Sequence, residues 1–344
     1  MTLLPTSWRD RRRGRTGSTR SRHGALLLGV LLVAGPVGCT GAAEPSGPPA
    51  SASPGASPGA SRDAGRPAAA ADSREWLRVD GGTREYLLHR PAGGAGPRPL
   101  VVAFHGRGSD AEELRGVSRL EKAAAARGML VAYPEGLRDA WGAGSAATKE
   151  RPDPDADVRF AEALVGELVR AGRADPERVY AAGFSNGGAM ALRVAAQRPG
   201  LIAGAAAVSG QLPAGRAVVR PTGAVPVMII YGEKDPVRPL GGLLRPGPAP
   251  AGEEPITPTM SARDSVAAFA DAGGARGPVT KSAAGYDRTV WGPGPAGAAV
   301  ELLVMHGAGH TWPGSTITPP KGFGRISTAL NAADTIVDFF AAQR

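Results

Sequence analysis

The sequence predicts an α/β fold with a mostly parallel sheet and helices on both of its faces. From Trp76 onward, short apolar runs alternate with alanine-rich segments of helical character, an alternation that produces parallel sheets. The later apolar runs are continuous, as expected of strands that are covered on both faces. About 270 residues from this point suffice for one domain of this kind.

Eight apolar runs are interpreted as strands, and Gly81-Gly82 between the first two predicts an antiparallel N-terminal hairpin. The strands are Trp76–Val79, Glu85–His89, Leu100–Phe104, Leu130–Tyr133, Val179–Ala182, Ala205–Val208, Val227–Tyr231 and Val300–Met305. Five segments have helical character. They are Ala111–Arg127, Asp157–Ala171, Gly187–Arg198, Ser261–Ala272 and Ser327–Ala342.

The segment before this domain has a different composition. Residues 40–73 repeat Ser-Pro-Gly-Ala and contain no aliphatic side chain larger than alanine. Such a segment buries too little apolar area to offset its conformational entropy, so a disordered tether is predicted. The resulting organisation is a signal peptide over residues 1–38, a Pro/Ala/Ser/Gly-rich tether over 39–73 and an α/β domain over 74–344.

The N-terminus has the pattern of a secretory signal. An arginine-rich stretch ends at Arg22, and the apolar run Ala25–Ala34 follows. That run is too short to span a bilayer, which needs about 20 residues. Gly38 and Cys39 resemble the lipobox of bacterial lipoproteins, although Pro36 stands where an aliphatic residue is usual. We expect a secreted protein anchored to the membrane by a lipid on Cys39. The alternative is plain secretion with an incidental cysteine.

Charge and cysteine content exclude several classes of protein. Residues 1–38 hold seven arginines against one aspartate, a net charge of +6, which leaves +3 of the total +9 for the rest of the chain. A basic character confined to an N-terminal arm argues against a nucleic-acid partner. The single cysteine excludes both an intrachain disulfide and a zinc site built from cysteines.

The sharpest motif is Gly183-Phe184-Ser185-Asn186-Gly187, between a predicted strand and a predicted helix. G-x-S-x-G in this context is a nucleophile elbow, which exposes the hydroxyl of Ser185 on a strained turn. Side chains at either outer glycine would crowd that turn. The alternative is a glycine-rich turn in which the serine only caps the helix.

A serine nucleophile requires a histidine base, and only His306 and His310 follow Ser185 in the chain. His310 lies in a loop just after a predicted strand, where a base is wanted, whereas His306 ends that strand and is expected to pack locally. We therefore assign the base to His310. The pair could also bind a metal, but the glycines at 307 and 309 argue against the helix that such a pair requires, so no metal is predicted.

The orienting acid should follow the strand Val227–Tyr231. Asp235 lies a short turn beyond that strand, within reach of a histidine. Glu233 is the nearby rival, and Asp287 is a more distant one. Both rivals are interpreted as solvated charges, and Asp235 is assigned as the acid.

The oxyanion of the tetrahedral intermediate requires two hydrogen-bond donors. One is the backbone N–H of Asn186, the residue after the nucleophile. The other is assigned to the backbone N–H of Arg107 in His105-Gly106-Arg107-Gly108, where glycines allow close approach to a substrate. His105 precedes the serine and is expected to shape this loop. The alternative is an ordinary glycine turn.

These motifs together resemble the esterase/polyhydroxybutyrate-depolymerase family of α/β-hydrolases, which includes feruloyl and acetylxylan esterases. In chain order they are LVVAFHGRGSD, YPEG followed by Trp141, Asp157-Val158, DPERVYAAGFSNGGAMAL, YGEKDPVRPLGG, GAGHTWPG and DTIVDFF. The resemblance implies an α/β-hydrolase fold and ester hydrolysis by Ser185, Asp235 and His310 without a metal or organic cofactor. It also implies that Trp141 and Trp312 line the acyl pocket. The chain departs from many relatives in lacking disulfides and in the Pro/Gly-rich stretch Leu243–Pro258.

The function expected from the sequence is that of an extracytoplasmic serine carboxylesterase acting through an acyl-enzyme. Its substrate would be a hydroxyalkanoate oligomer of the polyhydroxybutyrate type, or a feruloyl or acetyl ester of a polysaccharide. Two alternatives stay open. One is a non-catalytic cell-wall-binding lipoprotein on a hydrolase scaffold, and the other is a prolyl-type serine peptidase.

Overall fold

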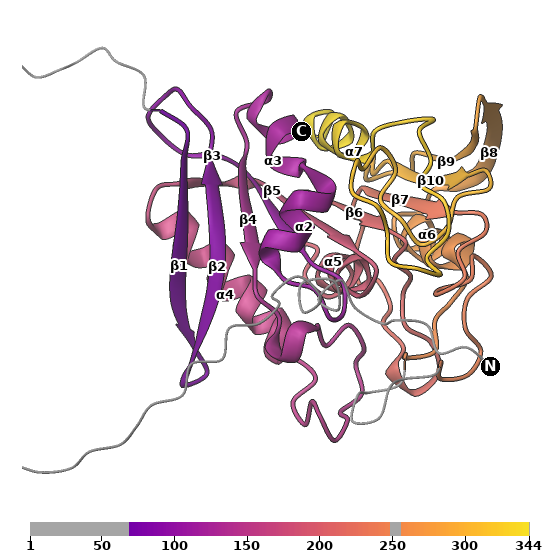
Figure 1. Ribbon diagram of the computed structural model, residues 1–344, viewed down its shortest axis with the longest axis horizontal. Coiled ribbons are helices and arrows are strands. Elements are labelled where there is room, and N and C mark those ends of the chain that lie inside the picture. The colour runs from indigo at the N-terminus through magenta and orange to yellow at the C-terminus, as the bar shows by residue number, and fades with distance from the viewer. Residues whose placement is uncertain (1–68, 248–255, 344) are drawn as a thin grey trace, which may run out of the picture. The chain divides into compact units, whose positions relative to one another are not determined.

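The computed structural model describes residues 69–247 and 256–343. The strands of these residues form one ten-stranded sheet (Figure 1). In chain order the strands are β1 Ala71–Val79, β2 Gly82–Arg90, β3 Arg98–Phe104, β4 Leu130–Pro134, β5 Ala174–Phe184, β6 Gly204–Val208, β7 Val227–Gly232, β8 Arg276–Ala283, β9 Tyr286–Gly292 and β10 Val300–Met305. Their spatial order is β1-β2-β4-β3-β5-β6-β7-β10-β9-β8. The six central strands, β4 to β10 in that order, are all parallel neighbours, which confirms the prediction of a mostly parallel sheet.

Antiparallel hairpins flank this parallel centre on both sides (Figure 1). The predicted N-terminal hairpin is present as β1 and β2, with Trp76 opposite Glu85. Strand β1 begins at Ala71, so residues 71–73 belong to the sheet and not to the expected tether. Asp72 anchors this extension, because its carboxylate lies 2.6 Å from both His89 Nδ1 and Arg115 Nη2.

The second hairpin, β8 and β9, was not predicted. Strand β9 pairs antiparallel with β10, and β8 forms the edge of the sheet. Every residue of β8 is exposed. A strand without a buried face carries no alternation of apolar and polar residues, which explains why the sequence pattern does not reveal it.

The helices confirm the five predicted segments with two differences. They are α2 Ala111–Ser118, α3 Leu120–Ala125, α4 Ala156–Arg170, α5 Asn186–Gln197, α6 Ala262–Ala272 and α7 Ala332–Ala341. The first predicted helix is divided into α2 and α3, because Arg119 adopts a left-handed conformation with φ 51°. The last one begins later than expected, since the Asn331 side chain caps α7 by accepting from the N–H groups of Ala333 and Asp334.

Helices cover both faces of the sheet, as predicted. Successive residues of β3 alternate between two apolar clusters: Leu100 and Val102 join the one that holds Leu164 of α4, and Val101 joins the other. The first cluster is closed by α4, α5 and α6, and the second by α2, α3 and α7. Continuous apolar strands therefore have both faces buried.

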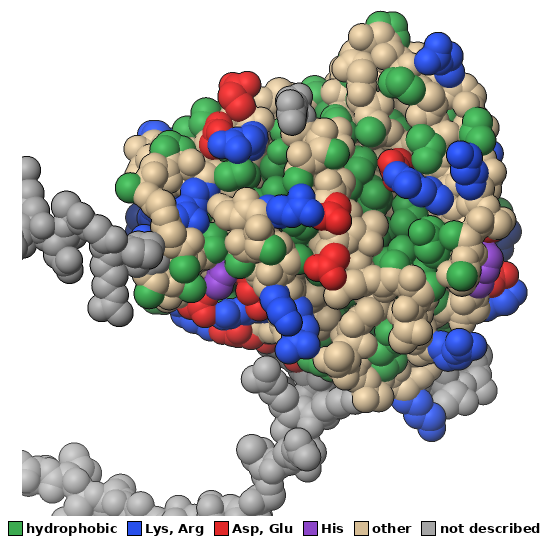
Figure 2. Space-filling view, turned by 90° about the horizontal axis from the view of Figure 1, so that it is seen from above, with side chains coloured by type: hydrophobic (Ala, Val, Ile, Leu, Met, Phe, Trp, Pro, Cys, Tyr) green, Lys and Arg blue, Asp and Glu red, His purple; other side chains and the backbone are tan. Residues whose placement is uncertain are grey.

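Charges are intermixed on the surface of the described residues. Figure 2 shows basic and acidic side chains scattered over one face, with no large area of a single sign. Ion pairs such as Arg173–Glu75 at 2.7 Å and Arg159–Asp80 at 2.8 Å neutralise neighbouring charges locally.

The expected signal peptide, Cys39 and the tether up to residue 68 lie outside the described residues. Within the described ranges, no helix combines the length and the apolar content that crossing a membrane requires.

Candidate active site

Ser185 lies on a sharp turn between β5 and α5. Its backbone has φ 57° and ψ −116°, a strained conformation for a residue with a side chain. A Cβ atom at Gly183 would lie 2.2 Å from the Gly187 carbonyl oxygen, and one at Gly187 would lie 2.0 Å from the Phe104 carbonyl oxygen. Both glycines are therefore required by close backbone approach, as the motif predicts. The Ser185 N–H donates to the Val208 carbonyl at 2.8 Å and ties the turn to β6.

The structure brings Ser185, His310 and Asp235 into one hydrogen-bonded row. His310 Nε2 lies 2.8 Å from Ser185 Oγ, and His310 Nδ1 lies 2.7 Å from Asp235 Oδ2. The three residues follow the strands β5, β10 and β7, whose carboxyl ends meet at the same edge of the parallel sheet. All three side chains are buried. This arrangement is that of a nucleophile, a base and an orienting acid.

Further contacts fix the orientation of the row. Asp235 Oδ1 accepts the backbone N–H groups of Val237 at 2.9 Å and Arg238 at 2.8 Å, so both carboxylate oxygens are engaged. The imidazole of His310 lies between the rings of Phe184 and Phe323, with centroid distances of 5.0 and 5.3 Å. The His310 side chain therefore has little freedom to leave Ser185.

The rival residues have other partners. The His306 side chain is 44% exposed and lies 3.3 Å from Asp287. Glu233 accepts the Gly307 N–H at 2.8 Å. That contact and the nearby Lys234 hold the pKa of Glu233 below its ordinary value. His306, Asp287 and Glu233 therefore form a group of their own at the surface.

The glycine loop after β3 lies against the serine. A Cβ atom at Gly106 would lie 3.7 Å from the Ser185 Cβ atom. His105 is fully buried, and its Nε2 accepts the Gly136 N–H at 2.9 Å, so its Nδ1 donates to the Gly106 carbonyl at 2.8 Å. His105 thus shapes this loop, as expected, and joins it to the loop after β4. The role of the Arg107 and Asn186 N–H groups as oxyanion donors stays a prediction.

A cavity of about 450 Å³ lies beside this loop, and its lining includes Arg107, Asn186 and Trp141. The Trp141 N–H donates to Asn186 Oδ1 at 2.7 Å, and Asn186 Nδ2 donates back to the Trp141 carbonyl at 3.1 Å. The indole Nε1–H donates to the His105 carbonyl at 2.9 Å. These hydrogen bonds hold Trp141 at the cavity, and its role as a residue of the acyl pocket stays a prediction.

Trp312 does not line this cavity, and its expected place in the acyl pocket stays a prediction. It is 2% exposed, belongs to the apolar cluster beneath α7 and is absent from the lining of this cavity. Its ring meets Phe184 edge-on at 6.3 Å. The short loop after His310 thus packs this large side chain against buried apolar residues.

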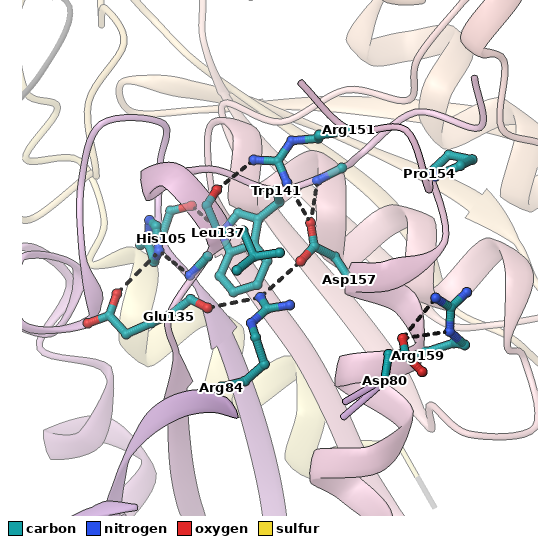
Figure 3. A network of polar contacts seen from close by, with 12 residues as sticks. Asp80, Arg84, His105, Glu135, Leu137, Trp141, Arg151, Pro154, Asp157 and Arg159 are labelled. Atoms are coloured by element: carbon teal, nitrogen blue, oxygen red, sulfur yellow. Dashed lines mark hydrogen bonds and ion pairs between the residues drawn. The ribbon is translucent and has the colours of Figure 1, made fainter. Parts of the chain in front are cut away.

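The cavity wall is held by buried charges that the sequence analysis missed (Figure 3). The loop 135–155 between β4 and α4 carries Trp141 and much of the lining. Asp157 binds Arg84 at 2.9 Å, accepts the Gly142 N–H at 2.7 Å and lies 3.1 Å from Arg151. Arg84 also donates to the Glu135 carbonyl at 3.0 Å. The network ties this irregular loop to β2 and α4.

Arg193 of α5 also holds the loop 135–155 in place. It is fully buried and donates to the carbonyls of Gly142, Gly144 and Pro154 at 2.6, 2.7 and 2.6 Å. A lone arginine within the apolar run Met190–Ala196 was the available signal, because a buried guanidinium must find acceptors.

Comparison with known proteins identifies relatives of this chain. Residues 93–243 match the phospholipase/carboxylesterase family. NocK of Nocardia uniformis subsp. tsuyamanensis, a protein assigned as an esterase, is 43% identical over 93% of this chain and 98% of its own length. Feruloyl esterase B of Piromyces equi is 28% identical over 66% of this chain and 42% of its own length.

One solved structure supports the fold alone. The acetyl xylan esterase from Aspergillus awamori superposes with a TM-score of 0.51 at 16% identity, covering 78% of this chain and 99% of the other. The match to NocK extends over nearly the whole of both chains. The chain belongs to the carboxylesterase family of the α/β-hydrolases and is a serine hydrolase that acts on ester bonds.

Proposed function

We propose that this protein is an extracytoplasmic carboxylesterase that hydrolyses its substrate through Ser185, His310 and Asp235. The observation that carries the proposal is the row of hydrogen bonds at 2.8 and 2.7 Å that joins the three side chains. The row also argues against a non-catalytic binding protein, because a scaffold without catalysis has no need of it.

The chemistry follows from the geometry. His310 Nε2 takes the hydroxyl proton as Ser185 Oγ attacks the ester carbonyl, and Asp235 stabilises the imidazolium that forms. The N–H groups of Asn186 and Arg107 receive the negative charge on the carbonyl oxygen. The imidazolium then gives its proton to the departing alcohol, which leaves an acyl group on Ser185. Water activated by His310 releases the acid and restores the serine.

Two substrate groups fit this site. Two relatives are named feruloyl esterase and acetylxylan esterase, and these names support acyl esters of polysaccharides as substrates of this protein. Hydroxyalkanoate oligomers form the other group. A cavity of about 450 Å³ is of the size that holds small molecules, which suits one acyl or alcohol unit of either group.

The N-terminal sequence supports the proposed location. A basic segment, a short apolar run and Cys39 precede the folded part, a pattern typical of secretion. We expect the mature chain to begin at Cys39 with a diacylglycerol on its sulfur. Mass spectrometry of the mature N-terminus tests this directly, and an unmodified start beyond residue 39 contradicts the anchor.

The catalytic proposal is tested by Ser185→Ala. The variant should fold normally and lose about 10³- to 10⁶-fold in ester turnover, since alanine fits the turn but has no attacking oxygen. Ser282→Ala, on the exposed strand β8, is the matched control and should retain activity. Near-normal turnover by a folded Ser185→Ala protein would remove Ser185 as the nucleophile.

A further inference from the structure

Arg238 is a buried cation whose side chain lacks a partner within the described residues. It follows the acid loop after β7 and is 5% exposed. Its main chain is fixed, because its N–H donates to Asp235 Oδ1 at 2.8 Å and its carbonyl accepts the Tyr231 hydroxyl at 2.9 Å. By contrast, no hydrogen bond or ion pair of its guanidinium is found in the described ranges. The buried Arg193 shows the ordinary pattern, with three backbone carbonyls as acceptors.

A guanidinium remains protonated in proteins, so Arg238 carries a positive charge that no acceptor within the described residues pairs with. Burial lowers the pKa of Arg238, while Tyr231 and Asp235 act in the opposite direction. No hydrogen bond joins the Arg238 side chain to Asp235, whose oxygens bind His310 and the backbone N–H groups of Val237 and Arg238.

Arg238 lines the cavity that Asn186, the residue after Ser185, also lines. A ligand that fills this space of about 450 Å³ therefore reaches both. The charged residues of the lining are four cations, Arg107, Lys149, Arg151 and Arg238, against the single carboxylate of Glu150, and Arg151 is paired with Asp157. Glu150 forms an ion pair with Arg138. The cavity therefore favours a ligand with negative charge.

Neighbouring polar groups already have partners. Gln211 Nε2 donates to the Pro239 carbonyl at 2.8 Å, and Gln211 Oε1 accepts from Thr259 Oγ1 at 2.8 Å. Of the lining residues Gln211, Thr259 and Arg238, only Arg238 has side-chain donors without a partner in the described residues. Its planar fork matches a carboxylate, which it can bind through two parallel charge-assisted hydrogen bonds.

We propose that Arg238 binds a carboxylate of the substrate and selects anionic esters. This inference rests on the proposed esterase function and chooses between its two substrate groups. A short hydroxyalkanoate oligomer carries a free carboxylate on its leaving alcohol. Acetyl and feruloyl esters of neutral sugars carry none. The substrate class is therefore an ester whose alcohol is a hydroxy acid.

The test compares the linear dimer of 3-hydroxybutyrate with its primary amide, which has nearly the same shape but no charge. Wild-type enzyme should prefer the acid. Arg238→Met should lower kcat/KM for the acid about 10- to 100-fold and for the amide less than about 3-fold, as expected for loss of a hydrogen bond between charged groups. Arg238→Lys should give an intermediate loss. Arg216→Met, which removes an exposed arginine outside the lining, should leave the preference unchanged.

Equal losses on acid and amide would overturn the inference, because they indicate that Arg238 acts by positioning Asp235. An absence of preference in the wild type would overturn it as well. If the variants fail to fold, inhibition of the wild type by 3-hydroxybutyrate and by 3-hydroxybutyramide, with a neutral acetyl ester as substrate, still decides. Equal inhibition by both compounds contradicts the proposal. Activity of Ser185→Ala would instead sink the esterase mechanism itself.

Discussion

The three side chains proposed to be catalytic and the cavity wall are held in place by different interactions. Ser185, His310 and Asp235 lie on short turns at the ends of β5, β10 and β7, fixed by backbone hydrogen bonds and by glycines that permit close approach. The wall is the long loop 135–155, and buried charged side chains from β2, α4 and α5 hold it. Parallel strands position the first region, whereas specific side chains position the second.

This difference separates chemistry from selectivity. A turn at a strand end is held by the hydrogen bonds of the sheet. The side chains of Ser185, His310 and Asp235 should therefore stay aligned when residues of the loop 135–155 are changed. A long irregular loop keeps one conformation only if its backbone polar groups find partners. Changes in the wall should therefore alter which ester is accepted, while changes in the row should abolish turnover of every ester.

The largest effect is expected within the row. His310→Ala should lower kcat at least about 10³-fold for all esters, since the serine loses its base. His306→Ala should stay within about 3-fold of the wild type, because His306 pairs with Asp287 at the surface. Turnover of acetyl and bulkier esters by both variants measures this. A severe loss in His306→Ala with an active His310→Ala would transfer the base to His306.

A smaller and selective effect is expected in the wall. Arg193→Met removes the donors to three loop carbonyls and should lower the free energy of unfolding by about 3–5 kcal/mol. The loosened loop should raise KM for feruloyl esters more than for acetyl esters. Denaturant melts and paired kinetics measure both quantities.

Arg198→Met is the matched control for that variant. Arg198 forms a half-exposed ion pair with Glu162, and such pairs contribute only about 0–1 kcal/mol. Comparable destabilisation by the two variants would contradict the view that the buried arginine anchors the wall.

The smallest effect concerns Glu135, which lies where the two regions meet, 3.6 Å from His105 Nε2. Burial raises the pKa of Glu135 to about 7. The negative charges of Asp110 and Glu85 also raise this pKa, whereas the hydrogen bond from the Ala111 N–H lowers it. The folded state thus retains a proton that the unfolded state loses near pH 4, so stability falls as pH rises from about 4 to 7. Glu135→Gln should be more stable than the wild type at pH 8 by on the order of 1–3 kcal/mol, and equal to it at pH 4. Melts at both pH values measure this, and a difference independent of pH would refute the assignment.

Much of the fold could be predicted from the sequence because its signals are local. Ser185 lies between glycines, and both Asp235 and His310 follow apolar strands, so the sheet itself brings them to one edge. Strand β8 gave no signal, since all of its residues are exposed. The break at Arg119 comes three residues after Gly116, and the residue at the break is itself neither glycine nor proline.

The supporting arginines were harder to predict for a different reason. A pattern shows that Arg193 interrupts an apolar run, but its acceptors come from loop residues distant in the chain. The packing of Trp312 likewise depends on which way a short loop turns, which no local rule determines. Arg238 is the extreme case, because its significance is the absence of a partner within the described residues, and only coordinates reveal that.

The exposed strand β8 has a consequence for the behaviour of the protein at high concentration. It is the last strand of the sheet, so its outer backbone N–H and carbonyl groups offer a template on which a strand from another molecule could add. Pro278 supplies no N–H to such a pairing, and Lys281 places a charge along the same edge. These two residues protect the esterase against edge-to-edge aggregation, a hazard that the exposed Val279 between them would otherwise increase.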